Sequence, residues 1–289
     1  MSDQEARAAR GRTPKPNLRE EAGGVYKKRV SKPPSPTALD TSRRPAAEAS
    51  YGAPPAESAR IVARTVFGSD HRVQVPDTTV YPYSAIADVS MTFQDGATSW
   101  GGTAWFIGPY TLMTAGHNVY SPDPTYDWAA SIKVMPGRDG GVLPFGWIMA
   151  SNWDAAYGWK HGGDENYDYG VIVIPAALGN TVDWFGFHAM SDHGLLNTTA
   201  NVCGYPGDKD DGTTMWCDAE PISRVDEMNV YYETDTEGAM SGSPVYYEES
   251  GRAYAVAVHN YGGTSANSGR RITDDVFEWM KAWKDDPFG

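Results

Sequence analysis

The stretch Tyr169-Gly170-Val171-Ile172-Val173-Ile174 is a short apolar run with turn-forming residues close on either side of it. Similar runs lie at 85–91, 103–107 and 254–258, and Gly, Asn, Asp and Pro residues separate them. Many short strands at this spacing are typical of an all-β sandwich or barrel. The sequence therefore predicts an all-β body.

The last part of the chain departs from this pattern. Over residues 273–286, Val276, Phe277, Met280 and Trp283 fall on one face of a helix. Two aspartates stand in its first turn and two lysines near its end, as the helix dipole favours. We expect a C-terminal helix at about 274–285.

Composition and charge exclude several classes of protein. The 289 residues are 40% hydrophobic and 12% aromatic, which suffices for a buried core. The formal net charge of −13 argues against a general nucleic-acid binder, which needs a basic surface. No run reaches the about 18 apolar residues that a membrane helix needs, and two cysteines are too few for a multi-cysteine zinc site. We expect no nucleic-acid or membrane partner, no metal and no cofactor.

The charge is divided unevenly along the chain. Residues 1–64 hold 13 Lys and Arg against 7 Asp and Glu, whereas residues 65–289 hold 11 against 30. The first segment is rich in Pro, Ala, Arg and Ser, and such a composition cannot offset its own ordering entropy. Two interpretations stay open: a disordered basic tail, or a pro-segment that lies on the acidic body and is then cut off. No apolar run of a secretory signal stands near its start.

Three local patterns carry candidate chemistry. His117 stands among small residues in Thr114-Ala115-Gly116-His117-Asn118, and histidine is the side chain best suited to moving protons near neutral pH. Asp168 stands at the mouth of the run 169–174, where burying a carboxylate is costly unless it is paired. Ser241 lies in Gly238-Ala239-Met240-Ser241-Gly242-Ser243-Pro244, a tight loop that can expose a hydroxyl beside converging backbone N–H groups. Taken alone, each pattern also fits a structural histidine, a solvent-facing aspartate or an ordinary turn.

The chain order His, Asp, Ser is that of the chymotrypsin-like catalytic triad. Residues 65–285 also resemble the glutamyl endopeptidases of the chymotrypsin-like clan, both the staphylococcal V8-type and the Bacillus-type enzymes. The resemblance implies two perpendicular six-stranded β-barrels, at about 80–180 and 185–272, with the active site in the cleft between them. The motifs that carry it are Val66-Phe67-Gly68-Ser69-Asp70, Tyr81-Pro82-Tyr83, Trp105-Phe106-Ile107-Gly108-Pro109, Thr114-Ala115-Gly116-His117, Gly204-Tyr205-Pro206-Gly207-Asp208-Lys209, Ser241-Gly242-Ser243-Pro244 and Asp274-Asp275-Val276-Phe277.

By this resemblance Ser241 is the nucleophile, His117 is the general base and then acid, and Asp168 holds the imidazole. The oxyanion donors are the backbone N–H groups of Ala239 and Ser241. Relatives usually carry glycine where Ala239 stands. If φ is positive there, alanine costs about 1 kcal/mol, which predicts a weaker oxyanion hole.

Two further positions match the family's pocket for P1, the residue before the cleaved bond. His259 matches its histidine and Thr236 its threonine, and these groups can bind a carboxylate by hydrogen bonds, with charge assistance if the imidazole is protonated. Asp235 stands where trypsin-like enzymes place the aspartate that selects Lys or Arg, and in that pocket it would repel a glutamate. We expect its carboxylate to point elsewhere, because the histidine has no role in a Lys/Arg pocket.

The cysteine pattern departs from that of the Bacillus-type relatives. Their disulfide beside the catalytic histidine falls on Gly102 and Asn118, so both halves are absent here. Cys203 and Cys217, 14 residues apart, form either a hairpin-spanning disulfide or two buried thiols. A disulfide would fit secretion, which we expect although no signal segment is visible.

A cut after Arg64 would release Thr65-Val66-Phe67-Gly68, which resembles the mature start of the Bacillus-type enzymes. In V8-type relatives the new α-amino group lies near the P1 pocket, so Thr65 is a further candidate for substrate binding. Our hypothesis is a secreted, monomeric serine endopeptidase domain over residues 65–289, acting on proteins or peptides with Glu, or Asp, at P1. The alternatives are a chymotrypsin-like protease of other specificity (Lys or Arg if Asp235 lines the pocket) and a non-catalytic binding module on the same fold.

Overall fold

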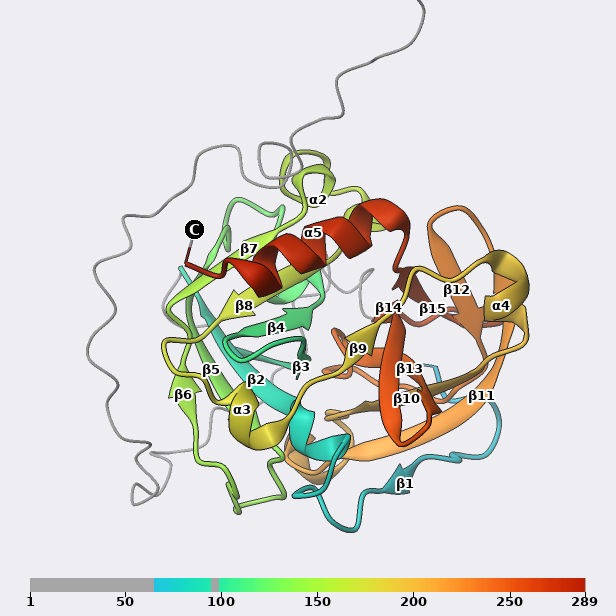
Figure 1. Cartoon of the computed structure of the whole chain (residues 1–289), viewed down its shortest axis with the longest axis horizontal. Coiled ribbons are helices and arrows are strands. Elements are labelled where there is room, and N and C mark those ends of the chain that lie inside the picture. Colours follow the sequence, from blue (N-terminus) through green and yellow to red (C-terminus); the bar gives the residue numbers. More distant parts are fainter. Residues whose placement is uncertain (1–64, 95–98, 289) are drawn as a thin grey trace, which may run out of the picture.

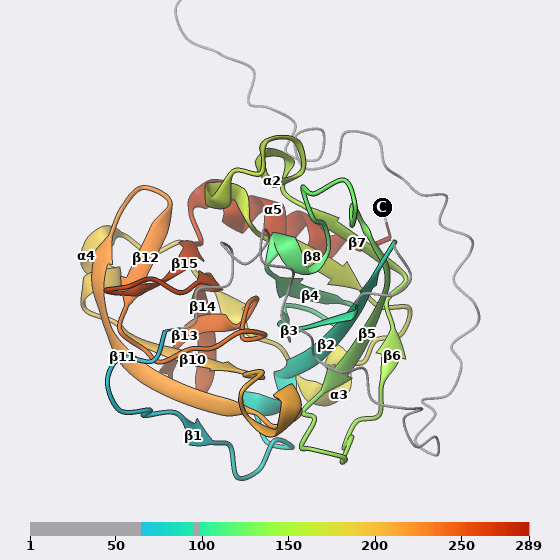
Figure 2. The same ribbon diagram turned by 180° about the vertical axis from the view of Figure 1, so that it is seen from behind.

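The computed structural model describes residues 65–94 and 99–288. The segment 1–64, predicted as a basic tail or pro-segment, lies outside the described residues. The described residues form two β-sheets that, apart from one short strand at the start, follow each other along the chain, and a helix comes after them (Figures 1 and 2). The predicted mostly-β architecture with a C-terminal helix is confirmed.

The first sheet is curled and has the strand order β6-β5-β2-β3-β4-β8-β7. β6 and β7 lie on its two edges although they follow each other in the chain. Between them Ala150 donates its N–H to Ile132 of β5, and Ser151 donates to Val173 of β8. One short segment therefore hydrogen-bonds both sides of the curled sheet. Its strands are β2 Ile86–Phe93, β3 Ser99–Phe106, β4 Thr111–Thr114, β5 Ala129–Pro136, β6 Ile148–Met149, β7 Asn152–Ala155 and β8 Gly170–Val173.

The second sheet closes into the predicted six-stranded barrel. Strands β10, β13, β14, β15, β12 and β11 form a ring, because β11 pairs with both β10 and β12. Side chains that include Val202, Val230 and Val256 fill its interior. The remaining strands add to this ring, β1 against β11 and β9 against β14. The strands are β1 Val73–Gln74, β9 Gly186–Phe187, β10 Thr199–Gly204, β11 Trp216–Val225, β12 Asn229–Tyr232, β13 Pro244–Glu249, β14 Arg252–Tyr261 and β15 Asn267–Arg271.

The four apolar runs in the sequence fall in β2, β3, β8 and β14. β8 is buried along its whole length, which explains why it shows no polar alternation. It pairs with β4 on one side and with β7 on the other. β8 therefore lies inside the first sheet, and the residues just before it approach the interface between the two sheets.

Helix α5 (Asp274–Asp285) follows the second barrel in the chain but packs on the first sheet, where Figure 1 shows it in red. Of the four apolar residues on the predicted face, Val276 and Met280 are buried and the other two are half-buried, and Trp279, which was not predicted, is buried beside them. Trp279 meets Tyr169 edge to face, with ring centroids 5.0 Å apart. The Thr111 hydroxyl also donates to the Trp283 carbonyl at 3.1 Å. Phe277 contacts Phe187 of β9 in the second sheet, with ring centroids 4.9 Å apart, so the helix contacts both sheets.

Residues 65–72, here called the N-terminal strap, precede the first sheet but bind to the second. The strap leads into β1, which Figure 1 shows beside β11. Short helices make other connections between the strands. They are α2 Tyr157–Gly162, α3 Gly179–Val182 and α4 Asp192–Leu196, with the 3-10 turns η1 Tyr83–Ala85, η2 Gly116–Asn118, η3 Glu165–Tyr167 and η4 Asp210–Gly212.

Candidate active site

The histidine and aspartate of the predicted triad come from neighbouring strands of the first sheet. β4 ends at Thr114 and η2, which carries His117, follows it, while Asp168 comes just before β8. Because Thr114 pairs with Gly170, these two segments lie side by side. His117 Nδ1 lies 2.6 Å from Asp168 Oδ2, and the backbone N–H of His117 donates to Asp168 Oδ1 at 2.8 Å. The structure therefore brings the two predicted residues together.

A glycine makes this close approach possible. A Cβ at Gly116 would lie 2.8 Å from Asp168 Oδ1, so a larger residue would push the carboxylate away. The Asp168 side chain is fully buried, whereas that of His117 is 12% exposed. A buried carboxylate depends on its hydrogen-bond donors. The imidazole supplies one of them and keeps a partly accessible edge.

Ser241 comes from the second barrel, in the loop between β12 and β13. The loop is fixed by backbone hydrogen bonds, including Gly242 N–H to His259 and Thr103 N–H to the Ser241 carbonyl. The Ser241 hydroxyl donates to the Asn260 carbonyl at 3.4 Å. In the described part of the chain, no hydrogen bond joins Ser241 to His117. Such catalytic contacts are often long before substrate binds.

Asn118 connects the two halves of the site. Its Nδ2 donates to Thr114 Oγ1 at 2.8 Å and to the Ser241 carbonyl at 2.9 Å. A Cβ at Gly102 would lie 2.7 Å from that Nδ2. Gly102 and Asn118, the positions onto which the resemblance places a disulfide of the Bacillus-type relatives, therefore lie next to each other. A hydrogen-bonding amide occupies the space and holds the peptide of Ser241.

Two residues of β14 complete the surroundings of Asp168 and were missed by the sequence analysis. The Tyr261 hydroxyl donates to Asp168 Oδ2, and Asn260 Nδ2 donates to the Asp168 carbonyl. Burial and the neighbouring Asp168 charge raise the pKa of Tyr261 well above its usual range, so this hydroxyl stays a donor. The one signal in the sequence is their place directly after His259.

The backbone of Ala239 has the conformation that the oxyanion argument required. Its φ is +71°, in the left-handed region that favours glycine. The peptide that carries the Ala239 N–H is held by its other end, where the Gly238 carbonyl accepts from the Gly207 N–H at 2.7 Å, and the Ala239 carbonyl accepts from Thr103 Oγ1 at 3.0 Å. Within residues 65–94 and 99–288, neither the N–H of Ala239 nor that of Ser241 has an acceptor. Both donors are therefore available to another group.

The three predicted P1 residues all lie on the second barrel. Thr65 and Thr236 pair as an antiparallel bridge, with Thr236 N–H donating to the Thr65 carbonyl at 3.2 Å. His259 lies in β14 and is buried, and its Nδ1 is 2.8 Å from the Tyr232 hydroxyl. The pKa of His259 is lowered to about 3, chiefly by burial. The charge of His117 also lowers it, while a hydrogen bond to the Ser268 backbone acts in the opposite direction. The imidazole is therefore neutral at pH 7.

The sequence predicts that the Asp235 carboxylate points away from the P1 pocket, and the structure gives it a partner that was not predicted, the N-terminal strap. Its Oδ1 accepts from the Phe67 backbone N–H at 2.7 Å, and its Oδ2 accepts from the His71 backbone N–H at 2.8 Å. Its side chain is 1% exposed. Both oxygens are thus engaged by backbone N–H groups of the strap.

Comparison with known proteins shows the family of the chain. It is 35% identical to a glutamyl endopeptidase of Bacillus licheniformis over 98% of this chain and 86% of the relative. It is 38% identical to a Bacillus subtilis protein named extracellular metalloprotease, over 76% of this chain and 69% of that one. The chain belongs to the glutamyl endopeptidase family. No protein-family model matches it.

A solved structure supports the same assignment. A glutamyl endopeptidase in complex with MPD superposes with a TM-score of 0.67 and 30% identity, covering 76% of this chain and 100% of that one. The chain is thus a glutamyl endopeptidase-like serine protease of the chymotrypsin-like fold. The described part contains no helix long and apolar enough to cross a membrane. Nor do three His, Cys, Asp or Glu side chains gather anywhere in that part as a metal site would require.

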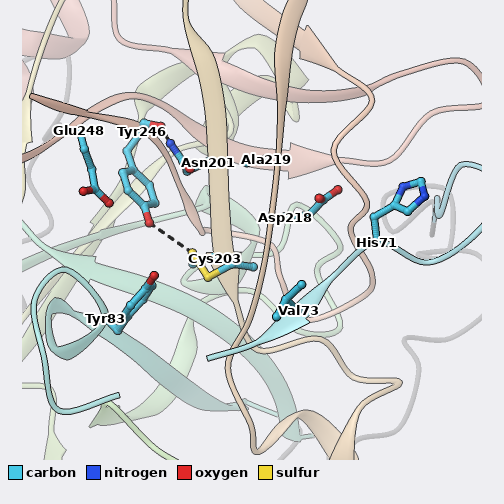
Figure 3. A pocket seen from close by; sticks show the side chains of 10 residues that line it. His71, Val73, Tyr83, Asn201, Cys203, Asp218, Ala219, Tyr246 and Glu248 are labelled. Atoms are coloured by element: carbon cyan, nitrogen blue, oxygen red, sulfur yellow. Dashed lines mark hydrogen bonds between the residues drawn. A yellow bond between two sulfur atoms is a disulfide. The ribbon is translucent and has the colours of Figure 1, made fainter. Parts of the chain in front are cut away.

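In this glutamyl endopeptidase-like chain the two cysteines lie apart from the triad. Cys203 of β10 and Cys217 of β11 form a disulfide with an S–S distance of 2.02 Å. Of the two states that the sequence left open, the bonded one is present. The disulfide lines a surface pocket of about 280 Å³, whose other lining residues include Tyr83 and Asp218 (Figure 3). The remaining predicted site residues do not line it.

Proposed function

We propose that the chain cleaves peptide bonds after glutamate through an acyl-enzyme, with Ser241, His117 and Asp168 as the catalytic triad. The observation that carries this proposal is the His117–Asp168 pair, tied through Asn118 and Asn260 to the loop that bears Ser241. Asp168 accepts from His117 Nδ1, which leaves Nε2 free to accept the serine proton. The names of the relatives point to the same substrate class.

The reaction uses these groups in sequence. The Ser241 hydroxyl turns from the Asn260 carbonyl to His117 Nε2 and attacks the scissile carbonyl as its proton passes to the imidazole. The N–H groups of Ala239 and Ser241 stabilise the negative oxygen of the tetrahedral intermediate. His117 then protonates the leaving amine, and it later activates the water that hydrolyses the ester.

Recognition of the P1 carboxylate needs a positive charge that His259 does not supply. With the Tyr232 hydroxyl donating to Nδ1, the neutral imidazole carries its proton on Nε2 and can donate it to a carboxylate. Thr236 adds a hydroxyl. The charge comes from the α-amino group of Thr65, whose usual pKa of about 7.7–8.0 keeps it mostly protonated at pH 7. Local charge matters because residues 65–289 carry 30 acidic against 11 basic residues, which repel acidic substrates.

This assignment includes the organisation of the chain. Residues 1–64 are a removable pro-segment and residues 65–289 the protease domain, which is secreted and monomeric and acts on proteins or peptides with acidic P1 residues. The disulfide and the name of the Bacillus subtilis relative support secretion. Sequencing the N-terminus of active protein tests the cut after Arg64, and a first residue far from Thr65 would contradict it.

The central experiment compares Ser241→Ala with Ser243→Ala in the same loop. The Ser243 hydroxyl is buried and has no hydrogen-bond partner within the described residues, so its loss tests for general damage to the loop. Ser241→Ala should lose peptide hydrolysis by several orders of magnitude and lose labelling by a fluorophosphonate. Ser243→Ala should keep both. If Ser241→Ala stays within about tenfold of the parent, the triad is wrong.

A panel of peptides that differ only at P1 tests the specificity. We expect Glu to be cleaved best, with Asp behind it and Gln, Leu and Lys far behind. His259→Ala should reduce kcat/KM for Glu peptides far more than for Leu peptides, because only the carboxylate loses a donor. Equal losses across the panel would remove His259 from the pocket. A preference for Lys or Arg would instead assign the pocket to Asp235.

A further inference from the structure

The N-terminal strap is held at its first residue from two sides. The Thr65 hydroxyl donates to the Gly263 carbonyl at 2.8 Å, and Asn267 Nδ2 donates to the Thr65 carbonyl at 3.1 Å. The bridge to Thr236 completes this contact. These bonds fix where residue 65 lies on the barrel, but they do not involve residues 66–71.

A buried carboxylate binds the strap at two further points, and the strap residues Asp70 and Arg72 add ion pairs to Lys209 and Asp208. Asp235 accepts the N–H groups of Phe67 and His71, which are four residues apart in the chain. A backbone N–H that donates to a carboxylate makes a charge-assisted bond, stronger than one to a neutral acceptor. Within the described residues Asp235 has no Lys or Arg partner, and the one basic side chain near it is the His71 imidazole at 3.6 Å. The carboxylate is therefore committed to the strap.

The position of Asp235 is itself fixed. Its backbone N–H donates to Asp218 Oδ2 at 2.7 Å, and the next residue in the chain is Thr236, which bridges to Thr65. Figure 3 shows Asp218 and His71 among the residues that line the surface pocket. Two neighbouring residues thus bind the strap: Thr236 through its backbone and Asp235 through its side chain.

We infer that Asp235 is a positioning residue for P1 recognition, acting through the N-terminus. Hydrolysis of the Arg64–Thr65 bond consumes one water, gives Arg64 a carboxylate and converts the Thr65 amide nitrogen into a protonatable amine. Asp235 holds the strap so that this amine is delivered to the P1 site. The carboxylate at the position that selects Lys or Arg in trypsin-like enzymes thereby serves selection of Glu. The inference rests on the proposed function and adds a residue to it.

The test compares Asp235→Ala and Asp235→Asn in two forms, the uncut chain and the form that starts at Thr65. Substrates are matched peptides with Glu or the isosteric, uncharged Gln at P1. In the cut form, we expect Asp235→Ala to raise KM for the Glu peptide about tenfold. The kcat for the Glu peptide should change less than about twofold, and so should kcat and KM for the Gln peptide. In the uncut chain the same substitution should have no further effect, because the amine that Asp235 positions does not yet exist.

Asp77→Asn is the matched control. Its carboxylate also accepts a backbone N–H, that of Thr79, but it lies in the chain beyond the strap. It should leave the ratio of Glu to Gln cleavage unchanged. Asp235→Asn keeps an acceptor oxygen but loses the charge, and it should fall between the parent and Asp235→Ala.

Fluorophosphonate titration counts the competent sites in every preparation, so that partial misfolding does not enter the kinetic constants. If Asp235→Ala gives no folded protein, Asp235→Asn alone decides, and an unchanged ratio of Glu to Gln cleavage overturns the inference. Equal losses in cut and uncut forms, or on both peptides, also overturn it. Failure of the proposed function has a different signature, since it would appear as labelling and cleavage that survive in Ser241→Ala.

Discussion

Tyr261 donates its phenolic proton to Asp168 Oδ2, the same carboxylate oxygen that faces the imidazole of His117. The tyrosine ring also lies near the imidazole, with centroids 6.1 Å apart. Asp168 is fully buried, so each of its donors replaces a water molecule that it cannot reach. Tyr261 is therefore a support for the aspartate, supplied by the opposite barrel.

Replacing Tyr261 with phenylalanine should lower kcat about tenfold and leave KM nearly unchanged. The substitution removes one donor from a buried carboxylate and does not touch the substrate, so the loss falls on the chemical step. Steady-state kinetics on a Glu peptide measures it.

Tyr254→Phe, on the same strand, is the control for loss of a hydroxyl, because Tyr254 stacks on Tyr247 away from the triad. It should keep the parent constants. A Tyr261→Phe enzyme with the parent kcat would show that His117 and Asn260 hold Asp168 without Tyr261.

The three residues proposed as the triad could be selected from the sequence, because each lies in a local motif, and the structure adds that His117 and Asp168 pair. The contacts of Tyr261 and Asp235 could not. Tyr261 is 93 residues from Asp168, and Asp235 is 168 residues from Phe67. Which way such side chains point is decided by the packing of segments that are distant in sequence. From its position in the trypsin-like pattern, the Asp235 carboxylate could either line the P1 pocket or point away from it. Its two hydrogen bonds to the strap favour the second.

The strands show the same limit. The runs 85–91 and 169–174 predicted β2 and β8, because short apolar segments between turn residues are typical of buried strands. The edges of the first sheet were not predictable, since β6 is two residues long and β7 shares one segment with it. The charge state of His259 was left open by the sequence for a related reason. It depends on burial, which local sequence does not fix.

A second prediction concerns the strained alanine of the oxyanion loop. Ala239→Gly should raise the free energy of unfolding by about 0.5–1 kcal/mol, because glycine adopts a φ of +71° without steric cost. Since the backbone already has the required conformation, kcat should stay within about twofold of the parent. Thermal unfolding and kinetics measure the two effects.

Ser250→Gly is a matched control for this prediction. Ser250 has a φ of +52° in the exposed turn between β13 and β14, at the opposite end of β13 from the oxyanion loop. It should give a similar gain in stability with no kinetic change. A gain in kcat of about tenfold for Ala239→Gly would mean that Ala239 weakens the oxyanion hole of the parent protein.

The last prediction follows from the buried, neutral His259. Its pKa is lowered from 6.5 to about 3 in the folded protein, whereas an unfolded histidine has a pKa of about 6.5. Between these values the unfolded chain binds the extra proton, so acidification favours unfolding. The contribution of this residue to stability is complete above about pH 6.5 and is lost as the pH falls towards 3, at up to about 1.4 kcal/mol per pH unit.

His259→Gln removes the titration, so the free energy of unfolding should fall less steeply over this range, whatever its absolute value. Denaturant unfolding at several pH values measures the slope, in a Ser241→Ala background that prevents self-digestion. His193→Gln, a change at an exposed histidine of α4, controls for the loss of a histidine and should keep the parent slope. Parallel curves for the parent and His259→Gln would contradict the lowered pKa, because they would mean that His259 takes up its proton over the same pH range in the folded and the unfolded chain.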